Sequence, residues 1–168
     1  PVRLQNVPRL TDVEDCLALL QGVGCTAGWQ GTELVVQGQP MRTDLAPEAA
    51  GRMRASILFC APLLARLGRA ETSLPGGCNI GARPIDLHLE GLARMGAKEL
   101  DAGAGKLVLA APGGLHGADI TLRFPSVGAT ETLLLAAVCA RGTTVLRGAA
   151  REPEISDLAE FLNRCGGR

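Results

Sequence analysis

Cys78 lies at the centre of the most unusual stretch of the sequence, a segment from Leu74 to Pro84 that contains three Gly and two Pro. Glycine and proline at this density predict a loop, and loops held by a rigid scaffold often carry function. A thiol near an arginine, here Arg83, and near the start of a helix has a lowered pKa. Cys78 is therefore a candidate acid or nucleophile, although an inert cysteine in a tight turn fits the residue types equally well.

Three predicted helix starts carry side chains that could bind an anion. These residues are Arg54, the pair Arg83 and Pro84, and the run Ser126, Val127 and Gly128. Free backbone N–H groups at a helix start favour phosphate or carboxylate, and arginine and hydroxyl side chains add donors there. The structural alternatives are a surface ion pair for Arg83 and, more strongly, a plain N-cap for Ser126. The spacing is that of neither a P-loop nor a GxGxxG motif, so no bound cofactor is predicted.

Two further polar residues follow Pro84. Asp86 falls in the first turn of the predicted helix, where a carboxylate complements the helix dipole. His88 has neither a serine partner nor a set of metal ligands close to it in the sequence, so a structural role is favoured for it over a catalytic one.

The six cysteines form no CxxC pair, and the sequence has only two histidines. A metal centre or redox motif is therefore not expected. Cys16, Cys60 and Cys139 lie inside apolar helical patterns, where a thiol usually behaves as a small buried hydrophobe. Reduced thiols of this kind indicate a cytoplasmic protein.

The composition argues against several classes of protein. Seventeen basic residues balance seventeen acidic ones, which disfavours a nucleic-acid partner or a polybasic membrane patch. The longest apolar runs, Ile57 to Ala65 and Leu133 to Ala140, are far shorter than the ~20 residues that cross a bilayer. A start at Pro1, without an initiator methionine, suggests a processed product or an excised piece.

An internal repeat organises the chain around three amphipathic helices. Each of the three apolar helical series ends at a glycine, namely Gly24, Gly96 and Gly166, which are separated by 72 and then 70 residues. The first series opens on Thr-Asp-Val-Glu at residues 11–14, which has the form of a capping box. Short strand-like segments precede the helices, at residues 2–4, 72–74 and 144–146.

A second kind of helix recurs at the same offset, at residues 54–67 and 126–140, and each copy leads into one of the strand-like segments. Strand candidates at 33–37, 106–110 and 120–124 are separated by Gly-rich turns. The repeat is therefore a strand-helix-strand-strand-helix unit, and the fold class is α/β (α+β). Units of this size share a core, so we expect one domain. The repeats span about residues 1–70, 71–142 and 143–168, the last of them truncated.

Four motifs resemble the bacterial UDP-N-acetylglucosamine enolpyruvyl transferase (1-carboxyvinyltransferase) family, in order along essentially all 168 residues. They are Met-Arg-Ala-Ser-Ile at 53–57, the loop 74–84 with Ile-Asp-Leu-His-Leu at 85–89, Ser-Val-Gly-Ala-Thr at 126–130, and Ala-Ala-Arg-Glu-Pro-Glu-Ile at 149–155. The cysteine loop followed by Ile-Gly-Ala-Arg-Pro and Asp-Leu-His separates this family from the shikimate-pathway enolpyruvyl transferase, which shares its fold.

The resemblance implies transfer of the enolpyruvyl group of phosphoenolpyruvate to the 3-hydroxyl of UDP-N-acetylglucosamine, releasing phosphate, as the first committed step of peptidoglycan synthesis. By resemblance, Cys78 donates a proton to the methylene carbon of phosphoenolpyruvate, can form a covalent adduct and is alkylated by fosfomycin, while Arg83 binds the phosphoenolpyruvate anion. The residues implied to hold the UDP-sugar are Arg54, Arg83, Pro84, Ile85, Asp86 and Leu87, with Ser126, Val127 and Gly128 near its diphosphate. The chemistry agrees, because protonating an enol ether needs an acid poised above the carbon.

The resemblance is incomplete in two respects. Phe124, beside Arg123, stands where the family usually has a lysine, so a cationic contact is lost or shifted. Members of the family also have two similar domains that form an inside-out α/β barrel, and this chain matches most of the cysteine-bearing domain alone. The second domain would supply the aspartate base. We therefore expect a fragment that is inactive alone. A catalytically silent sugar-nucleotide binding fragment and, less favoured, a shikimate-pathway enzyme stay open as alternatives.

Overall fold

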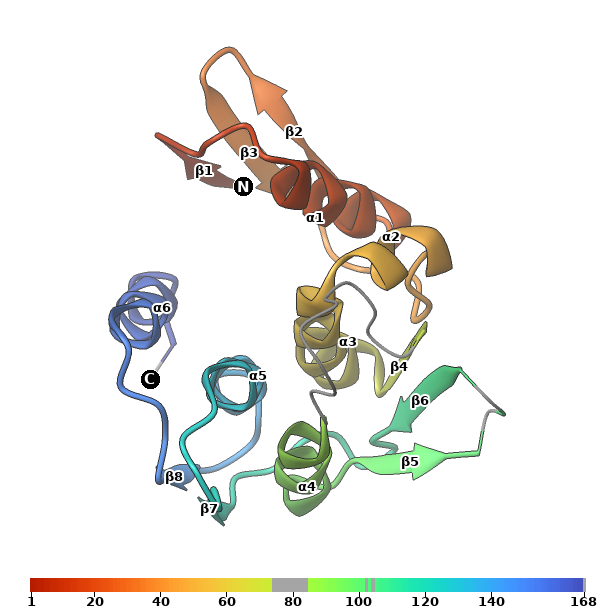
Figure 1. The fold of residues 1–168 in the computed structure, drawn as a ribbon, viewed down its shortest axis with the longest axis vertical. Helices are drawn as coiled ribbons and strands as arrows, with labels where there is room; N and C mark the ends of the chain where they lie inside the picture. Colours follow the sequence, from red (N-terminus) through yellow and green to blue (C-terminus); the bar gives the residue numbers. More distant parts are fainter. Residues whose placement is uncertain (74–84, 102, 104, 168) are drawn as a thin grey trace.

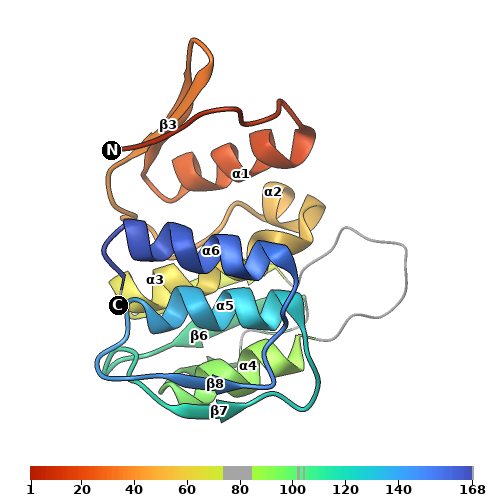
Figure 2. The ribbon, with the colours of Figure 1, turned by 90° about the vertical axis from the view of Figure 1, so that its left-hand side faces the viewer.

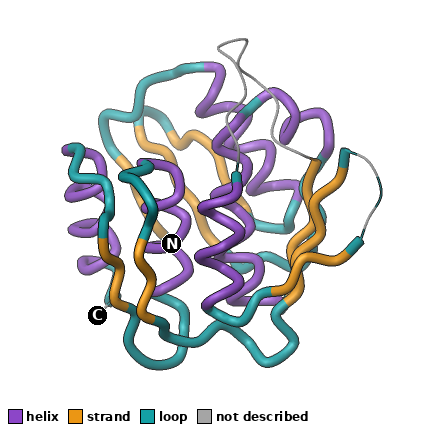
Figure 3. Tube along the Cα trace, turned by 60° about the horizontal axis from the view of Figure 1, so that its bottom comes forward, coloured by secondary structure: helices purple, strands orange, loops and turns teal. Residues whose placement is uncertain are grey.

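The computed structural model describes residues 1–73, 85–101, 103 and 105–167. The helices lie side by side, and the strands lie on the outside of them (Figures 1 and 3). This arrangement confirms the predicted α/β fold of repeated units. Within the described part of the chain, no helix is both long enough and apolar enough to cross a membrane.

The first repeat opens with a three-stranded antiparallel sheet and a helix. Its elements are β1 (Val2–Leu4), α1 (Thr11–Gly22), β2 (Thr26–Gln30) and β3 (Glu33–Gln37), in the strand order β1-β3-β2. Three helical segments follow, namely α2 (Pro47–Arg52), the 3₁₀ helix η1 (Arg54–Phe59) and α3 (Cys60–Leu67). Pro62 accounts for the 3₁₀ turns, because it has no N–H to bond to the carbonyl of Leu58 and is tolerated only in the first turn of an α-helix. The helix predicted at 54–67 is therefore α-helical only from Cys60.

The second repeat builds the same arrangement again. Its elements are β4 (Arg69–Ser73), α4 (Asp86–Arg94), β5 (Lys98–Leu100), β6 (Lys106–Ala110), β7 (Asp119–Thr121) and α5 (Val127–Ala137). The strand order β4-β6-β5 matches that of the first sheet. The third repeat begins with β8 (Val145–Arg147), which pairs in parallel with β7, and α6 (Pro153–Arg164). A parallel bridge between Asp44 and Glu71 occupies the corresponding place between the first two repeats.

The capping box predicted at the start of α1 is not formed. Leu10, rather than Thr11, is the N-cap residue, and no side chain caps this helix. The Glu14 carboxylate instead accepts a hydrogen bond from Nε1 of Trp29 at 2.9 Å. Glu14 therefore bonds to the hairpin of β2 and β3 instead of capping the start of its own helix.

Other predicted details are also wrong. The strand expected at 120–124 begins at Asp119 and ends at Thr121. Cys139 is exposed rather than buried, because α5 ends at Ala137 and the thiol lies beyond it. Strands β2 and β5 and helix α2 were not predicted, since each is short and lacks a clear apolar period.

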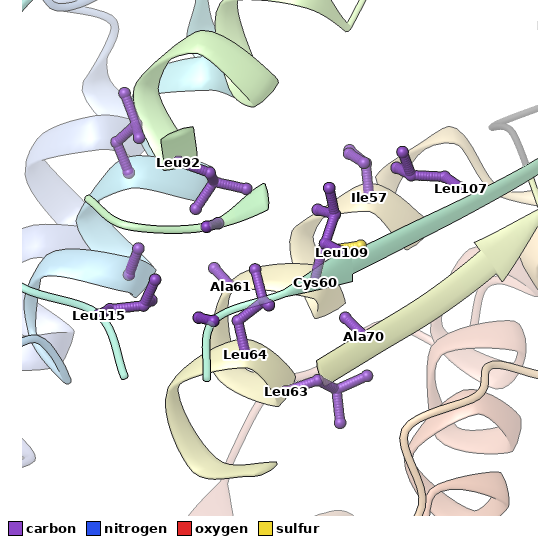
Figure 4. Packing of buried hydrophobic residues seen from close by; sticks show 14 of the residues in the cluster. Ile57, Cys60, Ala61, Leu63, Leu64, Ala70, Leu92, Leu107, Leu109 and Leu115 are labelled. Atoms are coloured by element: carbon purple, nitrogen blue, oxygen red, sulfur yellow. The ribbon is translucent and has the colours of Figure 1, made fainter. Parts of the chain in front are cut away.

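Helix α5 lies at the centre of the helical layer. It packs against α3, α4 and α6, and Figure 2 shows α3, α5 and α6 side by side. Its sequence is mostly apolar, as expected of a helix enclosed by other helices, whereas α6 is amphipathic and has only Ile155 buried. Figure 4 shows part of the core, in which Leu64 of α3, Leu92 of α4 and Leu109 of β6 belong to one cluster of buried side chains.

Helices α4 and α5 are in tight contact at Gly91. A Cβ atom added to Gly91 would lie 2.5 Å from Cδ2 of Leu133, a side chain of α5 that is 0% exposed. No L-residue with a Cβ fits there without a shift. The lack of a side chain at position 91 therefore sets the spacing of these two helices.

Replacing Gly91 by alanine should lower the free energy of unfolding by about 1–3 kcal/mol, because the added methyl group overpacks the contact with Leu133. The matched control is Gly51→Ala in α2, where an added Cβ would have no atom within 4 Å. That variant should be neutral or more stable by up to about 1 kcal/mol, since alanine is the better helix former. Urea unfolding measures both, and equal stability of the two variants would contradict the tight contact.

Candidate functional site

A cavity of about 710 Å³ opens between η1 and the first turns of α4 and α5. Five predicted site residues line it, namely Arg54, Leu87, Ser126, Val127 and Gly128. Its walls also include five polar or aromatic residues that were not predicted for the site: Asp12, Arg52, His88, Phe124 and Glu131. Segments far apart in the sequence therefore meet at one hollow.

Of the other predicted site residues that the structure describes, Ile85 and Asp86 are not among those that line this cavity. Ile85 is the N-cap residue of α4, and Asp86 begins the helix with its carboxylate engaged by Arg123. Cys78, Arg83 and Pro84 lie outside the described residues. The functional roles of all these residues stay predictions.

The first turn of α5 is held by hydrogen bonds on both sides. Ser126 is its N-cap, and the Oγ atom accepts a hydrogen bond from the N–H of Ala129 at 3.4 Å. The buried Thr130 hydroxyl donates to the Ser126 carbonyl at 2.8 Å and accepts from the N–H of Ala150 at 3.1 Å. The N–H groups of Val127 and Gly128 lie in the first turn, where no carbonyl of the helix can accept from them. They are therefore suited to bind an anion at the cavity wall.

His88 is buried, with 4% of its surface exposed, and its ring lies against α5. A Cβ atom added to Gly128 would lie 3.1 Å from Nε2 of His88. Burial and then the positive charge of Arg54 lower the pKa of His88 to about 4, against opposing effects of Asp86 and the nearby backbone of Ile85. The ring is therefore neutral at pH 7. It is buried, as a structural role predicts, and it also faces the cavity.

Arg123 joins two carboxylates of α4 at the edge of the site. It forms ion pairs with Asp86 and with Glu90, the latter at 3.1 Å. Its hydrogen bond is the main cause of the lowered pKa of Asp86. Phe124, in contrast, lines the cavity and has 52% of its surface exposed. Because Arg123 is paired with Asp86 and Glu90, it does not replace the lysine that the family usually has at position 124.

The cavity also has an acidic side. Glu131, on α5, has a raised pKa because of burial and the nearby charge of Glu154. Asp12 contributes a second carboxylate from α1, and Arg52 from α2 is paired with Asp15 at 2.6 Å. The spacing of Glu131, four residues after Val127, places both on one helix face and could have predicted its position. No local signal in the sequence links Asp12 or Arg52 to the site.

Solved structures with the same fold are enolpyruvyl transferases. The enolpyruvyl transferase NikO from Streptomyces tendae matches with a TM-score of 0.82, covering 96% of this chain and 38% of its own, at 23% sequence identity. EPSP synthase from Acinetobacter baumannii matches with a TM-score of 0.69, covering 92% of this chain and 36% of its own, at 18% identity. The fold is therefore that of part of an enolpyruvyl transferase.

The sequence defines the family. Residues 1–168 match the EPSP synthase (3-phosphoshikimate 1-carboxyvinyltransferase) family, and the chain belongs to it. A UDP-N-acetylglucosamine 1-carboxyvinyltransferase from Acidiphilium cryptum is 52% identical over 98% of this chain, and one from Oleidesulfovibrio alaskensis is 49% identical over 99%. The chain spans 40% and 39% of the length of these two relatives.

Replacing Thr130 by valine should lower the free energy of unfolding by about 1–3 kcal/mol, because the buried N–H of Ala150 loses its acceptor. Thr132→Val is the matched control. The Thr132 hydroxyl is also buried on α5, but it donates its hydrogen bond to the carbonyl of Gly128, which lies within the same helix. Its loss should cost less than about 1 kcal/mol. Urea unfolding compares the two, and equal losses would show that the Ala150 contact adds nothing.

His88 should make the stability of the fold depend on pH. Its pKa of about 4 in the folded state lies below the usual value of 6.5, so the unfolded chain takes up the proton first as the pH falls. This contribution is complete above pH 6.5 and is lost progressively toward pH 4, by no more than about 3 kcal/mol. His88→Asn should flatten the stability profile in this window when urea unfolding is followed at several pH values. Identical profiles would contradict a buried neutral ring.

Proposed function

We propose that the full-length polypeptide containing this chain transfers the enolpyruvyl group of phosphoenolpyruvate to the 3-hydroxyl of UDP-N-acetylglucosamine, releasing phosphate. In this proposal it acts in the cytoplasm, at the first committed step of peptidoglycan synthesis. Its substrates are both small molecules, and a second domain of the same polypeptide completes the site. The 168 residues alone are proposed to be catalytically inactive.

The observation that carries the proposal is the similarity to UDP-N-acetylglucosamine 1-carboxyvinyltransferases along the whole chain, at 49–52% identity. The residues expected near the diphosphate, Ser126, Val127 and Gly128, also form one wall of a cavity that Arg54 shares. An N-terminal helix turn in the same cavity as an arginine is the kind of surface that a diphosphate requires. The solved EPSP synthase, at 18% identity, supports the fold alone.

The proposed reaction is an addition followed by an elimination. The 3-hydroxyl oxygen bonds to C2 of phosphoenolpyruvate while Cys78 gives a proton to the methylene carbon, and the hydroxyl proton goes to a base. A proton then leaves the new methyl group, the bond from C2 to the phosphate oxygen breaks, and phosphate departs with the electron pair. Arg83 would hold the phosphoenolpyruvate anion. An acid and a cation at these two places match the charge changes at each step.

A phosphate-release assay on the full-length polypeptide tests the proposal. We expect release with phosphoenolpyruvate and UDP-N-acetylglucosamine, and none when shikimate 3-phosphate replaces the sugar nucleotide. Release of phosphate with phosphoenolpyruvate and shikimate 3-phosphate, but not with phosphoenolpyruvate and UDP-N-acetylglucosamine, would overturn the assignment in favour of the shikimate-pathway enzyme. The isolated chain should bind UDP-N-acetylglucosamine in calorimetry without releasing phosphate, and turnover by the chain alone would refute its proposed inactivity.

Cys78→Ala should lower the rate of phosphate release by about 10²–10⁴-fold if this thiol is the acid. Cys139→Ser is the matched control, because Cys139 is exposed and is not among the residues that line the cavity. Mass spectrometry after fosfomycin treatment should find the adduct on Cys78. Cys60 should stay unmodified, since burial raises its pKa to about 12. Loss of activity in the control, or labelling elsewhere, would rule out the role of Cys78.

Phe124→Lys should tighten the binding of UDP-N-acetylglucosamine about 5–10-fold at low salt, because it adds a positive charge to the cavity wall. The gain should shrink as salt screens the new charge. Phe161→Lys is the matched control, since Phe161 is exposed on α6 and does not line the cavity. Calorimetry at two salt concentrations measures both variants, and equal effects would show that position 124 has no particular access to the ligand.

A further inference from the structure

His88 is a buried polar residue of the cavity wall, and its Nδ1 atom has no partner among the described residues at normal hydrogen-bond geometry. Its surface is 4% exposed, and the backbone of Ile85 lies close enough to favour the protonated ring. A buried ring nitrogen without a partner is costly, so such a group calls for an explanation. Nε2, the other ring nitrogen, lies beside Gly128 in the first turn of α5. His88 therefore adjoins the place where an anion would meet the N–H groups of that turn.

The charged groups around His88 come from several elements. Arg54 of η1 disfavours the protonated ring, and Asp86 of α4 favours it but is itself paired with Arg123. Among the residues that the structure describes, the other charged members of the cavity wall are Asp12 of α1, Arg52 of α2 and Glu131 of α5. Arg52 is paired with Asp15. Without a ligand, burial and Arg54 dominate and the ring is neutral.

We propose that binding of a diphosphate ligand at the first turn of α5 drives a proton from solvent onto His88, and that the resulting cation helps to hold the ligand. This inference rests on the proposed function, because it takes the bound anion to be the diphosphate of a UDP-sugar. The balance is simple. One proton leaves the buffer acid, it bonds to the ring nitrogen that carries none in the neutral form, and both ring nitrogens then donate.

The direction follows from the charges. A diphosphate brings two negative charges beside Arg54, so it offsets the cation that disfavours protonation and adds its own attraction for the proton. Opposite charge within ~4–6 Å raises the pKa of a histidine by about 1–3. From about 4, such a rise brings His88 to between about 5 and 7. Uptake should thus be largest midway between the free and bound pKa values, at about pH 4.5–5.5, and small at pH 8.

Calorimetry of the full-length polypeptide with UDP-N-acetylglucosamine, in two buffers of different ionisation enthalpy at pH 6, measures the protons bound. The diphosphate of this ligand is esterified at both ends and does not titrate near pH 6, so uptake reports the protein. We expect about 0.1–0.9 proton per ligand at pH 6, the range that a bound pKa between about 5 and 7 gives. His88→Asn should abolish that uptake and weaken binding more at pH 6 than at pH 8. His116→Asn is the matched control, since His116 is exposed and does not line the cavity, and it should retain full uptake.

A second measurement keeps the test valid if His88→Asn does not fold. The ring signals of His88 in NMR spectra of the wild-type protein should titrate below pH 5 without ligand, and at least one pH unit higher with it. Binding of UDP-N-acetylglucosamine without uptake, or with equal uptake in His88→Asn, would overturn the inference and leave the proposed function intact. Inorganic pyrophosphate separates the two ideas. If it shifts the His88 signals while UDP-N-acetylglucosamine does not bind, the proposed function fails and the role of His88 stands.

Discussion

The contact of α4 with α5 at Gly91 controls the geometry of the cavity. Because Gly91 has no side chain, Leu133 reaches the backbone of α4 and the two helices lie close together. His88, three residues before Gly91 on the same helix, is thereby brought against Gly128 in the first turn of α5. A wider spacing would separate the histidine from that turn. The same packing of α4 against α5 therefore forms the core contact and positions the cavity residues. The buried hydroxyl of Thr130 also connects the start of α5 to Ala150, by accepting a hydrogen bond from its N–H group.

Electrostatics then decide what the cavity can hold. Two arginines near it are committed to protein carboxylates, since Arg52 pairs with Asp15 and Arg123 pairs with Asp86 and Glu90. Arg54 lies on the wall, and the backbone N–H groups at the start of α5 add partial positive charge. Exposed ion pairs such as those of Arg123 contribute little to stability. Their effect here is to fix the first turn of α4 and to leave Phe124, an apolar ring, on the cavity wall.

The sequence predicted the parts of the fold that depend on local patterns. Apolar spacing and terminal glycines located α1, α4 and α6, and the offset between copies revealed the repeated units. Ser126 was recognised as an N-cap because its hydrogen bond is made within the same turn. The capping box of α1 failed because Glu14 bonds to Trp29, fifteen residues away. Likewise, the meeting of His88 with Gly128 depends on long-range packing, which no local spacing encodes.

In the predicted site, too, local motifs could be predicted from the sequence, whereas contacts between distant segments could not. Residues of one continuous motif, Ser126 to Gly128, were selected together and lie together, whereas Asp12 and Arg52 come from segments with no motif of their own. Neighbours in sequence can also diverge, because Leu87 faces the cavity while Asp86 pairs with Arg123. A sequence motif therefore located the hollow but not its full lining.

The most direct test of the account is a crystal structure of the full-length polypeptide with UDP-N-acetylglucosamine. We expect the diphosphate to lie against the N–H groups of Val127 and Gly128, in the cavity that Arg54 also lines, with His88 beside the first turn of α5. A sugar nucleotide bound elsewhere on the chain, with this cavity empty, would contradict it.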